Sequence, residues 1–153
     1  MAVTEYRIGP VAPADTYPLR QRVLRPRLAV ADVAFPDDEH ADTAHLAARD
    51  QDGTVVGIAR VSPEPCPWAS GRTDGWQLRS MATAPERRGQ GIGALLLERA
   101  VRHVADSGGG LMWCNARSGA RSLYERAGFV PVGAFWDDPE LGPHLGMTRE
   151  VPA

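Results

Sequence analysis

The chain reads Pro85-Glu86-Arg87-Arg88-Gly89-Gln90-Gly91-Ile92-Gly93-Ala94 where a predicted strand gives way to the longest predicted helix. Three alternating glycines let the main chain approach a ligand closely and let several N–H groups point into one concavity. The first turn of the following helix adds unpaired N–H groups and the positive end of the helix dipole. The pattern therefore favours an anion site suited to a phosphate or diphosphate. The alternative is a turn whose glycines only ease the packing of helix on sheet.

Two other phosphate-binding patterns share features with this stretch. No Gly-Lys-Ser/Thr follows the glycines, which excludes a nucleoside-triphosphate loop. The spacing Gly89-x-Gly91-x-x-Ala94 matches the dinucleotide pattern in its letters. That fold, however, needs a tight turn directly after the strand and an acidic residue at the end of the next one. Here residues 84–88 intervene and the next strand ends in Cys114-Asn115-Ala116-Arg117, so the dinucleotide interpretation fails on context.

Hydrophobic periodicity predicts three helices. The clearest covers residues 89–107, because Ile92, Leu96, Ala100 and Val104 fall on one stripe. A first helix around residues 18–25 has Pro18 in its first turn, and Pro26 ends or kinks it. A third helix is capped by Ser118 and ends at Gly128.

Alternating apolar residues and turn signals predict seven strands, at residues 3–8, 44–49, 54–61, 76–83, 111–115, 129–135 and 144–151. A turn at residues 50–53 joins the second and third strands, residues 62–75 form a long connection, and residues 136–140 form an acidic loop. This order predicts an α/β fold in one domain spanning residues 1–153. Its mixed sheet is antiparallel at first and contains a strand-helix-strand crossover in the middle.

Composition describes an ordinary globular chain. The 153 residues carry a formal charge of -2, which gives no reason to expect nucleic acid or a membrane as a partner. All 17 basic residues are arginines, which indicates a GC-rich, bacterial coding bias. Two cysteines cannot build a disulfide scaffold, no Cys/His spacing resembles a metal site, and no signal peptide or membrane span is recognisable. A cytoplasmic protein is the expectation, and a homodimer is left open.

A second block strengthens the interpretation of the glycine turn. It runs Asn115-Ala116-Arg117-Ser118-Gly119-Ala120-Arg121-Ser122-Leu123-Tyr124-Glu125-Arg126-Ala127-Gly128-Phe129. Arg88-x-x-Gly91-x-Gly93, after a strand ending Met81-Ala82-Thr83, resembles the acyl-CoA signature of the GNAT superfamily of N-acetyltransferases. The second block is similar to that family's segment ending Leu-Tyr-Glu-x-x-Gly-Phe. The resemblance covers residues 76–130 well, and the flanks agree in element order.

The resemblance implies a GNAT fold with acetyl-CoA as donor. The strand before the glycine turn would splay from its neighbour, helped by a bulge, and open a V-shaped gap. Main-chain groups of Met81 and Thr83 would pair with the cofactor's amide-bearing arm. The amides of residues 88–94 would hold its diphosphate, and the Arg88 side chain would add charge. The thioester would lie near Met81 and Ala82, where a backbone N–H can stabilise an oxyanion.

The same resemblance makes Tyr124 the candidate general acid for the departing thiolate, since an unperturbed tyrosine pKa near 10 suits that proton transfer. The alternative is a core aromatic on the stripe with Leu123 and Ala127. The family places an asparagine where this chain has Arg117, so either Arg117 or Asn115 contacts the cofactor arm, or Asn115 only satisfies the strand end. Arg121 meets a ribose phosphate or is a solvated charge.

No general base is evident, because residues 76–81 contain no carboxylate where family members often use one. His144 and His45 are candidates, since a histidine can be neutral at pH 7; a structural role for each and a chain of waters are the alternatives.

Substrate signals conflict. Arg79 suits a carboxylate or phosphate on the acceptor, whereas Asp137, Asp138 and Glu140 suit a cation. Each of these charges is equally compatible with solvent exposure. Trp68, Trp76 and Trp136 line a pocket or pack in the core.

The sequence thus predicts an N-acetyltransferase that moves an acetyl group from acetyl-CoA to the amine of a small molecule or peptide by direct attack. Cys114 is not expected to be a nucleophile, because its apolar neighbours indicate a buried strand residue. One alternative is a non-catalytic acyl-CoA sensor on the same scaffold. Another is a nucleotide-dependent oxidoreductase.

Overall fold

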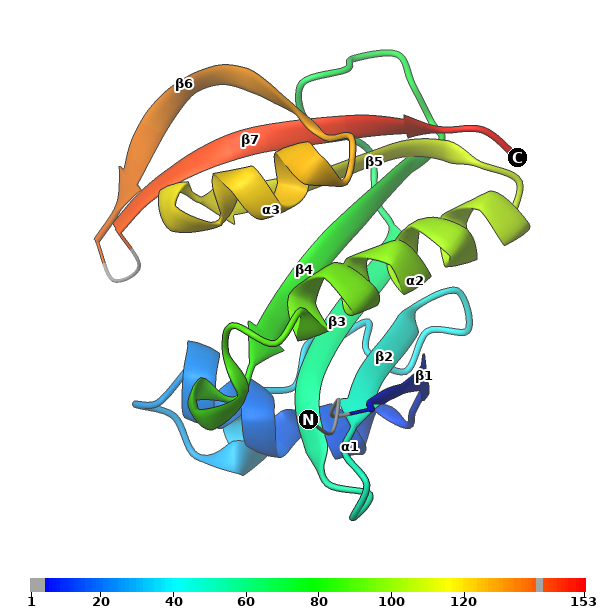
Figure 1. Cartoon of the computed structure of the whole chain (residues 1–153). Helices are drawn as coiled ribbons and strands as arrows, with labels where there is room; N and C mark the ends of the chain where they lie inside the picture. The colour runs from blue at the N-terminus through cyan, green and yellow to red at the C-terminus, as the bar shows by residue number, and fades with distance from the viewer. Residues whose placement is uncertain (1–4, 140–141) are drawn as a thin grey trace.

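A computed structural model describes residues 5–139 and 142–153 as one mixed sheet with helices on both faces (Figure 1). The strand order is β1-β2-β3-β4-β5-β7-β6, and all pairs are antiparallel except β4 with β5. The strands are β1 (Arg7–Pro10), β2 (Ala44–Arg49), β3 (Val55–Pro63), β4 (Gly75–Thr83), β5 (Gly110–Arg117), β6 (Val130–Asp138) and β7 (Gly142–Val151). The helices are α1 (Pro13–Leu19), α2 (Ile92–Asp106) and α3 (Arg121–Arg126), with short helical turns at Arg20–Leu24, Val30–Asp32, Pro85–Arg87 and Ser118–Ala120. The predicted order of strands and helices and the mixed α/β class are confirmed.

The core lies mainly between α2 and the sheet. The predicted stripe of Ile92, Leu96, Ala100 and Val104 is fully buried, so the periodicity of this helix is confirmed. Gly57 on β3 allows this packing, because an added Cβ would lie 2.6 Å from Cγ2 of Ile92. A side chain at residue 57 would therefore push α2 off the sheet.

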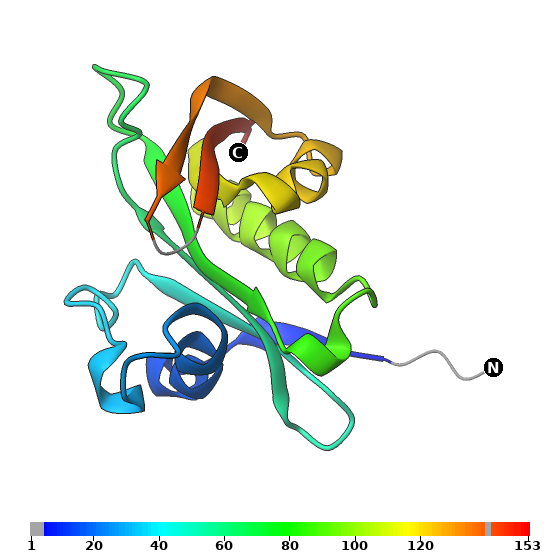
Figure 2. The ribbon, with the colours of Figure 1, turned by 90° about the vertical axis from the view of Figure 1, so that its left-hand side faces the viewer.

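The two faces of the sheet carry different elements. Figure 2 shows α1 and the turns that follow it on one face, and α2 and α3 on the other. No helix among residues 5–139 and 142–153 has the length and apolar character required to cross a bilayer.

The first helix differs from its prediction. It begins with Pro13, and Pro18 lies inside it rather than in the first turn. A proline in that place removes a main-chain donor and crowds the preceding turn, and the chain continues as a π-helical turn over Arg20–Leu24.

Strand boundaries shift where pairing overrides local pattern. β1 starts at Arg7 because its partner β2 ends at Arg49, opposite it; the predicted start of this strand lies outside the described residues. The predicted acidic loop is wrong for residues 136–138, since β6 resumes pairing with β7 after an irregularity near Gly133. β5 likewise continues to Arg117, and β3 to Pro63.

The predicted cap of the third helix is wrong. Ser118 opens a short 3-10 turn, and no side chain caps either that turn or α3. Residues 50–53 do form the expected turn, in which Oδ1 of Asp50 accepts hydrogen bonds from the N–H groups of Asp52 and Thr54.

Candidate active site

A gap opens in the middle of the sheet between the parallel strands β4 and β5. β4 and β5 are paired over Gly75–Gln77 and Leu111–Trp113 alone. Beyond these residues β4 stays with β3, up to Thr83, while β5 stays with β7, up to Arg117. The splayed strands expected from the resemblance are therefore present, and the second half of β4 has a main-chain edge that β5 does not cover.

A bulge in β4 lies at this gap. The register between β3 and β4 shifts from Ile58↔Ala82 to Arg60↔Arg79, so that Ser80 and Met81 stand opposite the single residue Ala59. Ser80 has a φ of 55°, unusual for a residue with a side chain. A bulge re-aims the neighbouring groups, and here it turns the strand beside the gap.

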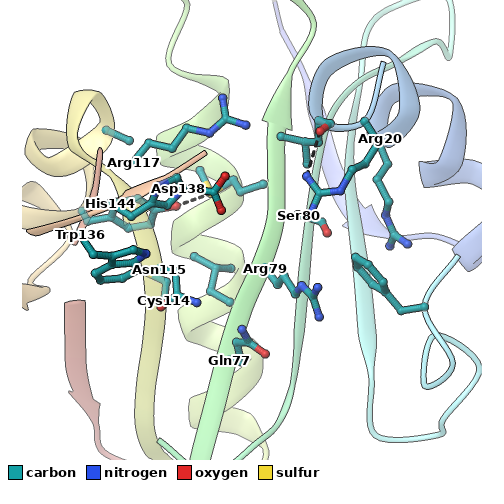
Figure 3. A pocket seen from close by; sticks show the side chains of 17 residues that line it. Arg20, Gln77, Arg79, Ser80, Cys114, Asn115, Arg117, Trp136, Asp138 and His144 are labelled. Atoms are coloured by element: carbon teal, nitrogen blue, oxygen red, sulfur yellow. Dashed lines mark hydrogen bonds between the residues drawn. The ribbon is translucent and has the colours of Figure 1, made fainter. Parts of the chain in front are cut away.

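The gap contains a cavity of about 290 Å³. Its walls come from β4, β5, α3, β6, β7 and the segment after α1, and Figure 3 shows the labelled side chains of the β5–β7 wall facing those of β4 and Arg20. The lining residues are Arg20, Leu24, Arg25, Phe35, Gln77, Leu78, Arg79, Ser80, Met81, Cys114, Asn115, Arg117, Ala120, Tyr124, Trp136, Asp138 and His144.

The glycine turn next to the gap has open main-chain donors. Gly89 and Gly91 have φ angles of 80° and 81°, and a Cβ at either residue would meet no atom within 4 Å. Gly91 is the N-cap residue of α2, and no side chain caps the helix. Within the described part of the chain, the N–H groups of residues 89–94 donate to no other protein group. These features fit a diphosphate, which needs several converging N–H donors and free space.

Side chains outside the turn hold it in place. The Arg87 guanidinium donates to Oδ2 of Asp50 at 2.9 Å, and the Tyr6 hydroxyl bonds to the side chain of Gln90. The Gln90 side chain is thus engaged by the protein, whereas Arg88 is exposed. Sequence reasoning missed Tyr6 and Asp50, because their role depends on strand neighbours far along the chain.

Tyr124 lies on α3 with its hydroxyl at the cavity. The ring is buried, packs edge-on against Phe129, and its hydroxyl donates to the sulfur of Met81 at 3.9 Å. Burial raises the pKa of Tyr124 well above its ordinary value of 10. The assumption of an unperturbed pKa is therefore wrong, and the phenol keeps its proton throughout the neutral range.

The predicted residues of β5 and α3 separate into two groups. Cys114, Asn115 and Arg117 line the cavity, and burial raises the pKa of the Cys114 thiol to about 12. Arg121 does not line it; its guanidinium donates to Oε1 of Glu125 at 3.0 Å, one helical turn away.

The two candidate histidines have different surroundings. Nδ1 of His144 donates to the carbonyl of Gly142 at 2.8 Å in the neutral tautomer, and the ring stacks on Trp136 at the cavity. That tautomer leaves the lone pair on Nε2. His45 lies outside the cavity lining, buried, with Nε2 at 2.9 Å from the carbonyl of Asp38.

The other side chains weighed as substrate contacts are also divided. Arg79, Asp138 and Trp136 line the cavity, whereas Asp137 is exposed and Glu140 lies outside the described residues. Trp76 packs edge-on against His103, and Trp68 packs edge-on against Trp113.

The segment between α1 and β2 supplies part of the wall. Phe35 and Arg25 line the cavity together with Arg20, and sequence reasoning missed all three. Asp38 fixes this segment, because its carboxylate accepts hydrogen bonds from Arg20 at 2.8 Å and Arg60 at 2.7 Å. Burial alone would raise the pKa of Asp38, but the hydrogen bonds from Arg20, from the Phe35 N–H and from Arg60 hold it well below its ordinary value.

Comparisons with known proteins agree with this geometry. Residues 14–129 match the model of the Acetyltransferase (GNAT) family. The chain is 33% identical to the uncharacterized N-acetyltransferase YitI of Bacillus subtilis (strain 168) over 137 residues, covering 90% of this chain and 91% of that protein. It is 30% identical to streptothricin acetyltransferase of Streptomyces lavendulae over 133 residues, covering 78% and 66% of the two chains.

Solved structures show the same fold. A GNAT superfamily phosphinothricin acetyltransferase from Sinorhizobium meliloti, solved in complex with acetyl-CoA, superposes with a TM-score of 0.73 at 20% identity, covering 99% of this chain and 90% of that one. The fold, the gap and the family match together define an acyltransferase. The chain belongs to the GNAT family of acetyltransferases.

Proposed function

We propose that this protein transfers the acetyl group of acetyl-CoA to an amine of a small molecule or peptide by direct attack within a ternary complex. The observation that carries the proposal is the row of N–H groups over residues 89–94 that no described residue accepts from, beside the gap between β4 and β5. Acetyl-CoA supplies an activated acyl group and a diphosphate. The acyl group needs a gap in the sheet to reach the amine. The diphosphate needs converging N–H donors that no side chain of the protein occupies.

Residues of this chain would divide the binding of the donor between them. The amides of residues 89–94 hold the diphosphate; the predicted Arg88 amide is excluded because it donates to the Pro85 carbonyl at 3.4 Å, and the exposed Arg88 side chain adds charge instead. The main chain of Met81, Ala82 and Thr83 faces the gap on the side that β5 has left, so it is available for sheet-like pairing with an amide-bearing arm. Asn115 and Arg117 contribute from the opposite wall.

His144 is the proposed general base. An amine must lose a proton to form an amide, and the base must carry a free lone pair in the cavity. The carbonyl of Gly142 can only accept, so Nδ1 carries a proton and, in the neutral ring, the lone pair is on Nε2; the stacked Trp136 ring holds the imidazole plane. No carboxylate on β4 competes for this role, since residues 76–81 have none.

Tyr124 is the proposed general acid. Its raised pKa keeps the hydroxyl protonated, and its only partner among residues 5–139 and 142–153 is the weakly accepting sulfur of Met81 at 3.9 Å. A hydroxyl bound so weakly is free to donate to a departing thiolate.

The test measures CoA release with acetyl-CoA and a panel of amines, followed by mass analysis of the acetylated product. Release that depends on the amine supports the proposal, and no release with any amine contradicts it. His144→Asn is expected to lower kcat by about 10²-fold or more, with the KM for acetyl-CoA little changed. His40→Asn is the matched control, since His40 is exposed and does not line the cavity. Equal loss in both variants would remove His144 from the mechanism.

A further inference from the structure

The wall of the cavity formed by β4 and the segment after α1 is rich in arginine. Arg20, Arg25 and Arg79 line it, and Arg117 faces them from β5. Among the described lining residues Asp138 is the one carboxylate, and Figure 3 shows it on the wall that also holds His144, away from Arg79. A cavity with this imbalance attracts an anion to one wall.

Arg79 has no compensating carboxylate bound to it within the described residues. Its guanidinium lies 3.9 Å from the centre of the Phe35 ring, and it forms neither a hydrogen bond nor an ion pair within the described residues. Burial and the neighbouring charges of Arg60 and Arg25 lower its pKa, which shows that like charges surround it. Stacking on Phe35 holds the plane of the guanidinium and leaves its edge of N–H donors available.

Nearby carboxylates are already engaged elsewhere. Asp37, whose field favours the charged form of Arg79, accepts a hydrogen bond from Arg60 at 2.7 Å. Asp38 is shared between Arg20 and Arg60. Neither therefore neutralises the cavity wall.

Arg20 and Arg25 add further side-chain N–H donors that the described residues do not fully satisfy. The side chain of Arg20 is 1% exposed; its NH1 bonds to Asp38 and to the carbonyl of Val33, but its buried Nε has no partner in the described part of the chain. A buried N–H donor without a partner is costly, so a ligand that reaches it is favoured. Arg25 donates to the main-chain carbonyl of Leu24 and forms no ion pair with any residue that the structure describes.

We propose, resting on the function proposed above, that the acceptor is a small amine that also carries an oxyanion, a carboxylate or a phosphonate, bound by Arg79 and Arg25. The planar edge of a guanidinium matches the two oxygens of either group. Arg79 lies two residues before Met81, with the bulge at Ser80 between them, so their Cα atoms are at most about 7 Å apart. This short separation suits a compact molecule with its amine and oxyanion a few bonds apart. A cavity of about 290 Å³ also favours such a molecule over a folded peptide segment.

The substrate experiment compares acceptors that differ only in the anionic group. Each α-amino acid is assayed beside its amide, its decarboxylated amine and its aminophosphonate analogue, with spermidine as a cationic amine. The amino acid or the aminophosphonate is expected to have a kcat/KM about 10-fold or more above that of the amide. The amine of the amide is less basic than that of the amino acid, so more of it is unprotonated near neutral pH. Amine reactivity alone therefore predicts that the amide is the better acceptor.

Arginine variants test which residues bind the oxyanion. Arg79→Gln and Arg25→Gln are expected to raise the KM for the oxyanion-bearing amine by about 10- to 100-fold. The KM for acetyl-CoA and the kinetics with the decarboxylated amine are expected to stay near those of the natural protein. Arg27→Gln is the matched control, because Arg27 is exposed on the same segment and does not line the cavity. Calorimetric titration of the preferred acid into the CoA-bound protein gives a readout independent of turnover, and Arg79→Gln is expected to abolish its heat.

The outcomes separate this inference from the proposed function. Transfer to amides, decarboxylated amines or spermidine at rates equal to those of the acids would overturn the inference and leave the transferase intact. The same holds if Arg79→Gln and Arg25→Gln behave like Arg27→Gln. No transfer to any amine would overturn the proposed function, and the inference with it.

Discussion

The hydroxyl of Tyr124 donates to the sulfur of Met81 across the gap in the sheet, at 3.9 Å. This contact joins α3, which follows β5, to the bulge of β4. It therefore links the two sides of the cavity. Sulfur is a weak acceptor, so the contact positions the phenol without holding its proton tightly. The same hydroxyl is buried and has no stronger acceptor among the described residues.

Tyr124→Phe tests the role of that hydroxyl. The variant keeps the ring and its packing against Phe129, so the fold is expected to hold. We expect kcat to fall by about 10-fold or more while the affinity for CoA changes little, because proton donation to the leaving group is lost. Thermal unfolding and CoA titration provide the controls, and an unaltered kcat would exclude Tyr124 as the acid.

Gly91→Trp tests the anion site. A side chain there adopts a φ of 81° and occupies the space in front of the open amides, so CoA binding should be lost. Gly71→Trp is the matched control, because Gly71 has a φ of 88° and equally open surroundings in the connection between β3 and β4. Both variants carry the same backbone strain, of about 1 to 2 kcal/mol. Normal CoA affinity in Gly71→Trp and none in Gly91→Trp is the expected result; retained affinity in Gly91→Trp would contradict the site.

The sequence predicted the parts of this fold that local pattern determines. The stripe of α2, the glycine turn and the block ending at Phe129 are contiguous signals, and their order led to the correct class and to a gap between β4 and β5. The features that the sequence did not predict depend on contacts between residues far apart in the chain. Asp38 sits in an acidic, solvent-like stretch, yet Arg60 on β3 and Arg20 after α1 bury it. The Phe35 ring stacks against the Arg79 guanidinium only once that buried cluster forms. No hydrophobic periodicity in the sequence indicates this contact.

Strand ends were missed for the same reason. Trp136 and Asp138 follow no alternating pattern, but β7 pairs with them and so turns both toward the cavity. Local composition predicts a loop there, and tertiary pairing overrides it.

Cys114→Ala tests direct attack. Burial raises the pKa of this thiol to about 12, so it is protonated at any working pH and is a poor nucleophile. We expect the variant to retain activity within a few-fold, and mass spectrometry of the natural protein with acetyl-CoA alone to show no acetylated chain. A burst of CoA release without amine, lost in Cys114→Ala, would instead indicate an acyl-enzyme.

Stability should fall as pH drops below about 6.5, the pKa of a histidine in the unfolded chain. Burial lowers the pKa of His45 and of His103 in the folded protein. Below that pH the unfolded state therefore binds more protons than the folded state, and the free energy of unfolding decreases. His45→Gln is expected to flatten part of this decrease between pH 7.5 and pH 5.5 in denaturant titrations, and an unchanged pH dependence in this variant would contradict the assignment to His45. The depressed pKa of Asp38 acts only below about pH 4, outside this range.

Asp38→Asn tests the buried charge cluster that supports the arginine-rich wall. The substitution leaves Arg20 and Arg60 buried with no full counter-charge at that position, so the free energy of unfolding should fall by about 3 to 5 kcal/mol. Glu86→Gln is the control: it removes an equally short ion pair, with Arg22, whose side chains are about half exposed, and should change stability little. Because Asp38 also accepts the main-chain N–H of Phe35 at 2.8 Å, its loss should release the ring beneath Arg79. Any Asp38→Asn protein that still folds is therefore expected to show a raised KM for the oxyanion-bearing amine and an unchanged KM for acetyl-CoA. Equal stability losses in the two variants would show that the cluster contributes no more than a surface ion pair.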